Sequence, residues 1–328
     1  MTAPLAASRG PKWGTSLITF FHPTFFGLPA ETSYPAYVEA AYADPRAYFD
    51  RMLDASRDAG LAGVELAPVP AGYEGALKAY GSVAGVQAAC ADRGLRIASS
   101  YMEGGHLIRP GLQDGQGRAE AAALVDEHAR FLAGVGCELI VMGTLPRLEF
   151  GDAAYGDVPP DIHEKVADEL NRLGSIAQRH GCKIALHTDA YSLFSRDADI
   201  DRMMELTDPD CIAMCLDSGH VTLDGGDAVA ILERHLDRIP VAHWKDADAP
   251  LDGRTLKGDF LERHEVMMSH FRWVGEGIVD WDRFMDIVGR AGWDGWAHAE
   301  FDFAEDPVSV LRAHVDICRG RMAERVAG

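Results

Sequence analysis

Acidic and imidazole side chains end two apolar runs between Cys211 and Asp246, CIAMCLDSGHVTLDGGDAVAILERHLDRIPVAHWKD. The first run ends in Asp217, with His220 close behind, and the second ends in His243, with Lys245 close behind. Carboxylates and imidazoles bind metal ions and move protons. Buried strands that end in such residues are typical of a site at the carboxyl ends of parallel strands. Each residue alone also fits a structural role, since Asp is a common helix N-cap.

Two further apolar runs end in the same residue types. Strand side chains alternate faces, so CKIALHTDAY puts His187 and Asp189 on one side, and GWAHAEFD does the same for His298 and Glu300. An oxygen-rich set with one imidazole suits Mn²⁺, Mg²⁺, Co²⁺ or Fe²⁺ better than a thiolate-type zinc site. The four runs together offer Asp189 or His187, then Asp217, His243 and Glu300.

A repeating pattern would position these residues. From residue 50 onward, helical patterns end near a Gly, and an apolar run begins one to three residues later. Gly just after a helix, followed by a buried strand, is half of a βα unit. Asp44 and Pro45 are expected to open the first helix as N-cap and first residue. The strand candidates lie near residues 14–19, 62–66, 95–100, 138–142, 182–187, 211–216, 239–244 and 295–300.

Eight such units without a break in composition predict one (β/α)8 TIM barrel over residues 13–320, after a disordered tail over residues 1–12. The alternative is a doubly wound open sheet. No GxGxxG or GxxxxGK[ST] motif follows a strand candidate, which weakens that alternative.

The bulk properties exclude several classes of protein. A net charge of -20 argues against binding to nucleic acid or to an anionic membrane, because both need a basic face. The six cysteines form no CxxC pair, the N-terminal stretch lacks the apolar region of a signal peptide, and no apolar run is long enough to span a membrane. These features predict reduced thiols and a cytoplasmic location.

Two long connections, residues 20–43 and 247–279, are expected over the catalytic face, where long loops often form lids. The first is rich in aromatic residues, which would suit a sugar ring or an aryl group. Phe25 and Trp273 are predicted to contact substrate. The alternative is that these aromatic residues pack the loops onto the rim of the barrel.

The motifs CLDSGH, AHWKD and HAEFD resemble those of the xylose-isomerase-like TIM barrels, a superfamily of sugar phosphate isomerases and epimerases, inosose dehydratases and endonuclease IV. GVEL and the stretch 274–281 also fit, and the resemblance covers roughly residues 13–318. It implies a divalent metal on acids that end strands five, six and eight and on a His of strand seven. Carried over, the last three are Asp217, His243 and Glu300, and His220 matches a substrate contact.

Strand five departs from the epimerase pattern. Sugar epimerases that this chain resembles usually place Glu there, whereas this chain has His187-Thr188-Asp189. Epimerisation uses two bases, while elimination needs one base and one acid for the leaving group. The inosose dehydratases and the catalytic subunits of C-glycoside-deglycosylating enzymes that it resembles carry histidine there.

We therefore expect a lyase that acts on a keto-sugar or keto-inositol, with His187 as the base. The expected cofactor is Mn²⁺, with Co²⁺ or Mg²⁺ as alternatives, on Asp189, Asp217, His243 and Glu300. Lys245 or His220 would hold substrate or assist the leaving group, and Glu65 and His298 would be polar lining.

Three other functions are alternatives to the lyase. A sugar isomerase or epimerase would use the same metal. An endonuclease of the endonuclease IV type would need a basic face, which a net charge of -20 opposes. A sugar-binding barrel without activity would not need the metal ligands. The resemblance also suggests a homo-oligomer and a possible small second subunit.

Overall fold

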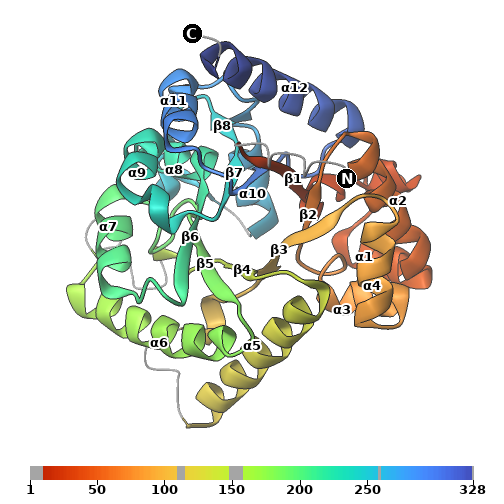
Figure 1. Cartoon of the computed structure of the whole chain (residues 1–328), viewed down its shortest axis with the longest axis horizontal. Helices are drawn as coiled ribbons and strands as arrows, with labels where there is room; N and C mark the ends of the chain where they lie inside the picture. Colours follow the sequence, from red (N-terminus) through yellow and green to blue (C-terminus); the bar gives the residue numbers. More distant parts are fainter. Residues whose placement is uncertain (1–9, 109–114, 148–157, 258–259, 327–328) are drawn as a thin grey trace, which may run out of the picture.

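The structure is a computed structural model that describes residues 10–108, 115–147, 158–257 and 260–326. Eight parallel strands close into a barrel in the order β1-β10-β7-β6-β5-β4-β3-β2. Figure 1 shows these strands at the centre of the molecule with helices around them. The predicted (β/α)8 barrel is thereby confirmed. Its strands are β1 (Lys12–Ser16), β2 (Gly63–Leu66), β3 (Arg96–Met102), β4 (Leu139–Met142), β5 (Lys183–His187), β6 (Ile212–Asp217), β7 (Val241–Trp244) and β10 (Trp296–Ala299).

Helices cover the outside of the barrel. The last of them contacts α11 and α2, so the C-terminal helix lies against the first large helix and completes the ring. Asp44 caps α2 by accepting a hydrogen bond from the Ala47 N–H, as the sequence predicts. The helices are α1 (Tyr34–Ala43), α2 (Pro45–Asp58), α3 (Tyr73–Tyr80), α4 (Val83–Ala91), α5 (Gly115–Val135), α6 (Pro160–Gln178), α7 (Asp197–Leu206), α8 (Ser218–Leu223), α9 (Ala228–His235), α10 (Phe260–Met268), α11 (Trp281–Ala291) and α12 (Pro307–Val326).

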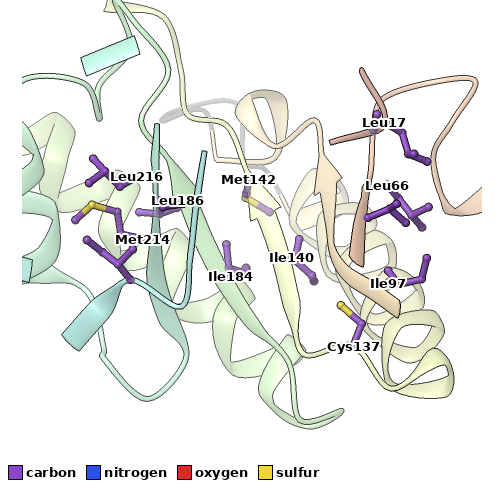
Figure 2. Packing of buried hydrophobic residues seen from close by; sticks show 14 of the residues in the cluster. Leu17, Leu66, Ile97, Cys137, Ile140, Met142, Ile184, Leu186, Met214 and Leu216 are labelled. Carbon is purple, nitrogen blue, oxygen red and sulfur yellow. The ribbon is translucent and has the colours of Figure 1, made fainter. Parts of the chain in front are cut away.

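The core has two layers because strand side chains alternate. Along β5 and β6, Ile184, Leu186, Met214 and Leu216 belong to the large cluster that includes the helices' buried residues, and Figure 2 shows them with their neighbours. The alternate residues fill the inside of the barrel as a smaller cluster. Its members are Leu139, Val141, Ala185, Ala213, Cys215 and Val241. This inner layer lies below the polar residues at the ends of the strands.

The first strand differs from its prediction. β1 ends at Ser16, and Leu17–Phe20 forms a short 3-10 helix instead of continuing the strand. The turn buries Leu17 and Phe20 and closes through the Phe21 N–H, which donates to the Ile18 carbonyl. The other seven strands lie within two residues of their predicted bounds. The predicted tail begins outside the described residues, and its last residue, Lys12, starts β1.

Both long connections contain structure of their own. The first carries a 3-10 helix, η2 (Pro23–Phe26), and α1. The second carries α10 and an antiparallel pair, β8 (Asp246–Ala247) with β9 (Phe271–Arg272). Across the parts of the chain described here, no helix is both long and apolar enough to cross a membrane.

Candidate active site

The barrel register brings the polar strand ends together. Asp217 of β6 lies opposite His243 of β7, and His243 lies opposite His298 of β10. His187 ends β5, opposite Cys215, and Glu300 follows β10 directly. Because parallel strands end at the same rim, these side chains meet inside the mouth of the barrel.

Three of the predicted metal ligands form one group. Single ligand atoms from Asp217, His243 and Glu300 all lie within 4.8 Å of one another. His243 Nδ1 is 3.0 Å from Glu300 Oε2 and 3.8 Å from Asp217 Oδ2. Atoms that bind one ion at about 2.1 Å stand roughly 3–3.5 Å from each other. The spacing therefore fits a single divalent cation.

Asp217 has one oxygen to spare for such an ion. Its Oδ1 accepts a hydrogen bond from the His220 N–H at 2.9 Å and so caps α8. Its Oδ2 is buried and has no hydrogen-bond partner. Burial alone would raise the pKa of Asp217, but the Lys245 ammonium and nearby imidazoles lower it well below its usual value. The residue is thus a carboxylate that caps a helix and also faces the cluster.

His187 and Asp189 form a hydrogen-bonded pair at the end of β5. His187 Nδ1 lies 2.8 Å from Asp189 Oδ1, while Nε2 lies 3.1 Å from His243 Nδ1 and 3.7 Å from Asp217 Oδ2. Burial would lower the pKa of His187, but the Asp189 carboxylate raises it well above its usual value. Asp189 supplies no atom to the Asp217, His243 and Glu300 group. Its predicted role as a metal ligand stays a prediction.

The ammonium of Lys245 neutralises the acidic strand ends. Nζ donates to Glu300 Oε1 at 2.6 Å and lies 3.4 Å from Asp302 Oδ1 and 3.5 Å from Asp217 Oδ2. Burial would lower the pKa of Lys245, but these three carboxylates raise it well above its usual value. Burial raises the pKa of Asp302 to about 7. Lys245 therefore pairs with the site carboxylates rather than with its neighbour Asp246.

Asp246 instead organises the loop before α11. Its fully buried carboxylate accepts hydrogen bonds at 2.8–3.1 Å from the loop. The donors are the backbone N–H groups of Gly275, Gly277 and Val279 and the indole N–H of Trp281. A Cβ on Gly277 would lie 2.2 Å from Asp246 Oδ1, so glycine is needed for this close approach. The VGEG segment is shaped around one carboxylate.

We expect Asp246→Asn to destabilise the protein. The amide replaces one accepting oxygen by a donor that faces other N–H groups, so the free energy of unfolding should fall by about 3 kcal/mol. Urea unfolding followed by circular dichroism measures this change. Asp294→Asn, a change at an exposed residue, should leave the unfolding midpoint unaltered. Equal midpoints for the two variants would contradict the role given to Asp246.

A cavity of about 790 Å³ opens above the cluster. His187, His243 and Glu300 lie at its floor, and His220 lines it as well. His220 Nδ1 accepts a hydrogen bond from the Ala190 N–H at 3.1 Å, and burial lowers the pKa of His220 to about 4. The ring is therefore neutral at pH 7 and carries its proton on Nε2.

Other residues predicted to bind substrate are placed differently. Glu65 is at the cavity floor, but its carboxylate already contacts His243. His298 is fully buried and is not among the described lining residues. Phe25 packs against Phe20 and Phe26, and Trp273 packs against Phe301, so neither lines the described part of the cavity. The positions of Phe25 and Trp273 fit the alternative in which the aromatic residues pack the loops onto the rim of the barrel.

Several residues that line the cavity were not predicted as site residues from the sequence. Tyr101 and Glu103 line the cavity at the end of β3, where alternation from Ser99 would have indicated them. Strand alternation already puts Asp302 on the side of His298 and Glu300, although it was not among the predicted site residues. His264 comes from α10, and its Nε2 lies 3.9 Å from Asp302 Oδ2. No strand pattern signals a residue that an inserted helix brings in.

A closed parallel barrel with carboxylates and imidazoles gathered at its strand ends is the arrangement of a (β/α)8 enzyme. Residues 53–319 match the family described as xylose isomerase-like TIM barrel, and the chain belongs to this family. The predicted resemblance is thus confirmed. The family and the relatives below make the chain an enzyme of the dehydratase or the isomerase and epimerase type.

The relatives include both sequences and solved structures. An inosose dehydratase of Lacticaseibacillus casei is 29% identical over 223 residues, which cover 66% of this chain and 71% of that protein. The crystal structure of the IolI protein with a bound zinc atom superposes with a TM-score of 0.67 at 15% identity, over 95% of this chain and 97% of that one. The probable 3-DHS dehydratase AsbF of Bacillus anthracis gives a TM-score of 0.61 at 15% identity, with 94% and 98% covered.

Proposed function

We propose that this protein is a divalent-metal-dependent lyase that removes an α-proton from a keto-sugar or keto-inositol and then eliminates a β-substituent. The observation that carries the proposal is the convergence of Asp217, His243 and Glu300 beside the paired His187 and Asp189. The likeness to an inosose dehydratase supports the reaction type.

Asp217, His243 and Glu300 would hold the ion. Oxygen donors with one imidazole favour Mn²⁺, with Co²⁺ or Mg²⁺ as alternatives. A divalent ion bound there supplies Lewis-acid polarisation of a substrate ketone and stabilises negative charge on its oxygen. Two features of Asp217 support the assignment: its buried Oδ2 has no hydrogen-bond partner, and its lowered pKa keeps the carboxylate ionised.

His187 would take the α-proton on Nε2. In this assignment the Nδ1–H donates to Asp189 Oδ1, which fixes the tautomer and turns the Nε2 lone pair toward the cluster. The ring also lines the cavity, so a substrate there would meet Nε2. The Asp189 carboxylate that raises the pKa of His187 also stabilises the imidazolium formed when the ring takes the proton, and the base works from the fraction of the protein in which His187 is neutral.

His220 would act on the leaving group, and Lys245 would hold the acidic residues of the site in place. The Nε2–H of neutral His220 can donate a hydrogen bond to the departing oxygen, because Nδ1 is held by the Ala190 N–H, and the proton that this oxygen gains as it leaves would be the one taken up by His187. Lys245 keeps Glu300 in place through its 2.6 Å contact and compensates the charge of the acids. A direct Lys245 contact with substrate remains a prediction, because Lys245 is not among the described lining residues.

The volume and the apolar lining of the cavity indicate which kind of leaving group would fit. Its volume of about 790 Å³ lies at the upper end of the range for drug-sized ligands and leaves room beyond one sugar ring. Apolar side chains also line the cavity, among them Ile18, Leu145, Leu256 and Met267. An aryl aglycone would bury apolar surface there. These features support the narrower proposal of a 3-keto-glycoside or C-glycoside substrate.

The second candidate is a metal-dependent sugar isomerase or epimerase. It would need a second proton carrier on the opposite face of the substrate, and Glu300 is the candidate at the end of β10. Both Glu300 oxygens are engaged, one by Lys245 and one by His243. Elimination needs no second base at this position, which favours the lyase.

Product mass separates the two candidates. The metal-loaded protein would be incubated with a keto-inositol, a free ketohexose and an aryl 3-keto-glucoside, and the products analysed by mass spectrometry. A lyase gives a product lighter by water or by the aglycone. A product of unchanged mass would overturn the proposal in favour of the isomerase.

Assembly and location are further proposals. The family resemblance suggests a homo-oligomer and a possible small second subunit, and the six buried free cysteines suit the predicted cytoplasmic location. Light scattering of the purified chain and co-purification from the native host test the first two. A monomer that reaches full activity alone would contradict both.

A further inference from the structure

Glu65 contacts a proposed metal ligand from across the barrel. It stands on β2, three strands from β7 around the barrel wall, and points into the interior. Glu65 Oε1 lies 3.2 Å and Oε2 3.3 Å from His243 Nε2. The His243 ring thus contacts Glu65 with one nitrogen and faces Asp217 and Glu300 with the other.

The Glu65 carboxylate is itself held in place. The Ser99 hydroxyl of β3 donates to Oε2 at 2.7 Å, and His298 Nδ1 lies 3.7 Å away. Glu65 is 1% exposed, so its orientation is set by these protein groups. A buried carboxylate without partners would be costly, and here Ser99 and His243 supply them.

The contact determines which nitrogen of His243 is available to an ion. A neutral imidazole has one N–H and one lone pair. With Nε2–H donated to Glu65, Nδ1 is the nitrogen left for an ion; it lies 3.0 Å from Glu300 Oε2, 3.8 Å from Asp217 Oδ2 and 3.1 Å from His187 Nε2, and an ion bound there would replace the Nδ1 proton. A carboxylate on the far nitrogen of a metal-binding His fixes the ring and increases its basicity as a ligand.

We propose that Glu65 is a positioning residue that fixes the tautomer and orientation of His243 for metal binding. The inference rests on the proposed function, in which His243 is a ligand. It replaces the expected role of Glu65 as substrate lining by one that acts through His243. Ser99 supports the same role one step further out.

The test measures metal affinity rather than activity alone. Glu65→Gln keeps the shape of the side chain and removes its charge, and we expect Mn²⁺ and Zn²⁺ to bind about 10- to 100-fold more weakly in a chelator competition. Nitrogen-15 NMR of the Zn²⁺-loaded wild type should show a protonated Nε2 on His243, identified by its loss in His243→Asn. The Nε2–H signal should move or broaden in Glu65→Gln.

A matched control and a second variant make the result decisive. Glu169→Gln changes another buried carboxylate on α6, which pairs with Arg118 of α5 and Arg172 of α6, and should leave metal affinity unaltered. If Glu65→Gln does not fold, Ser99→Ala carries the test and should weaken the ion in the same direction. Equal affinities and an unmoved Nε2–H signal in the folded variant would overturn the role of Glu65 alone. A wild-type protein that binds neither ion would overturn the metal-dependent function as well.

Discussion

Replacement of His187 by alanine is expected to lower kcat by about 10²- to 10⁴-fold while metal affinity stays within a few-fold of the wild type. The range is that of a general base in a proton-transfer step. The expectation follows from the Asp189 contact at Nδ1 and from the position of Nε2 at the cavity floor. Steady-state kinetics of the metal-loaded variant and a parallel metal titration measure both quantities.

Asp189→Asn separates the two roles that have been considered for Asp189. If Asp189 orients His187, the amide disturbs the tautomer and turnover falls while the ion still binds. His180 provides the matched control, because its Nε2 lies 2.8 Å from Asp126 Oδ1 in a similar pair on the outside of the barrel. His180→Ala should turn over normally. Unchanged turnover in a metal-loaded His187→Ala variant would contradict the role of His187 as the base. Loss of metal binding in this variant would indicate that His187 is a metal ligand instead.

Asp217→Asn is expected to abolish metal binding at working concentrations and to reduce activity to background. The amide keeps an oxygen that can cap α8 through the His220 N–H, so the helix is retained. The charge that Oδ2 directs at the cluster is lost, and the affinity should fall by more than about 100-fold, beyond the cost of losing an outer partner. Calorimetric titration of the chelated protein with Mn²⁺ measures the change.

The control for Asp217→Asn is a second capping aspartate. Asp227 caps α9 by accepting hydrogen bonds from the Val229 and Ala230 N–H groups and is not among the described residues around the cavity. Asp227→Asn should leave metal affinity and turnover unaltered. Full activity in a metal-free Asp217→Asn protein would contradict the metal site, whatever the behaviour of Asp227→Asn.

The strand ends were predictable because alternation is strict in a closed barrel. Period 2 places Cys215 and Asp217 on one face, and Val241 with His243, and the structure has these residues inside the barrel. Gly at the helix ends marked where five of the strands start, β2, β3, β4, β5 and β10. The first strand was misplaced because Leu17 and Thr19, which read as strand residues, are buried by a 3-10 turn instead.

Partner choice inside the site was not predictable from the sequence. Lys245 and Asp246 are adjacent, yet strand alternation sends Lys245 to Glu300 and Asp246 to the loop before Trp281. The contact between Glu65 and His243 joins residues 178 positions apart, and no sequence spacing encodes it. Which of Asp189 and His187 faces the other predicted ligands likewise depends on side-chain rotation at the end of β5.

The aromatic loop shows a further limit of sequence patterns. The composition of residues 20–43 indicates an aromatic surface, but it does not indicate which residues these rings pack against. Phe26 stacks on Tyr48 at 4.5 Å between ring centroids, and Tyr37 shares a hydrogen bond with Tyr48, so these rings join the loop to α2. The apolar lining of the cavity comes instead from residues such as Ile18 and Leu145, which follow strands, and Leu256 and Met267 in the insertion before β10.

Proton NMR in D₂O tests the central claim most directly. The Mn²⁺-loaded protein would be incubated with a keto-inositol and, separately, with an aryl 3-keto-glucoside. Because Mn²⁺ is paramagnetic, the protein would be removed before the spectra are recorded, or diamagnetic Mg²⁺ or Zn²⁺ would be used in its place. The account predicts a new enone signal with loss of water from the first substrate or of the aglycone from the second. Deuterium at a single carbon in an isomer of otherwise unchanged composition would contradict elimination and establish an epimerase.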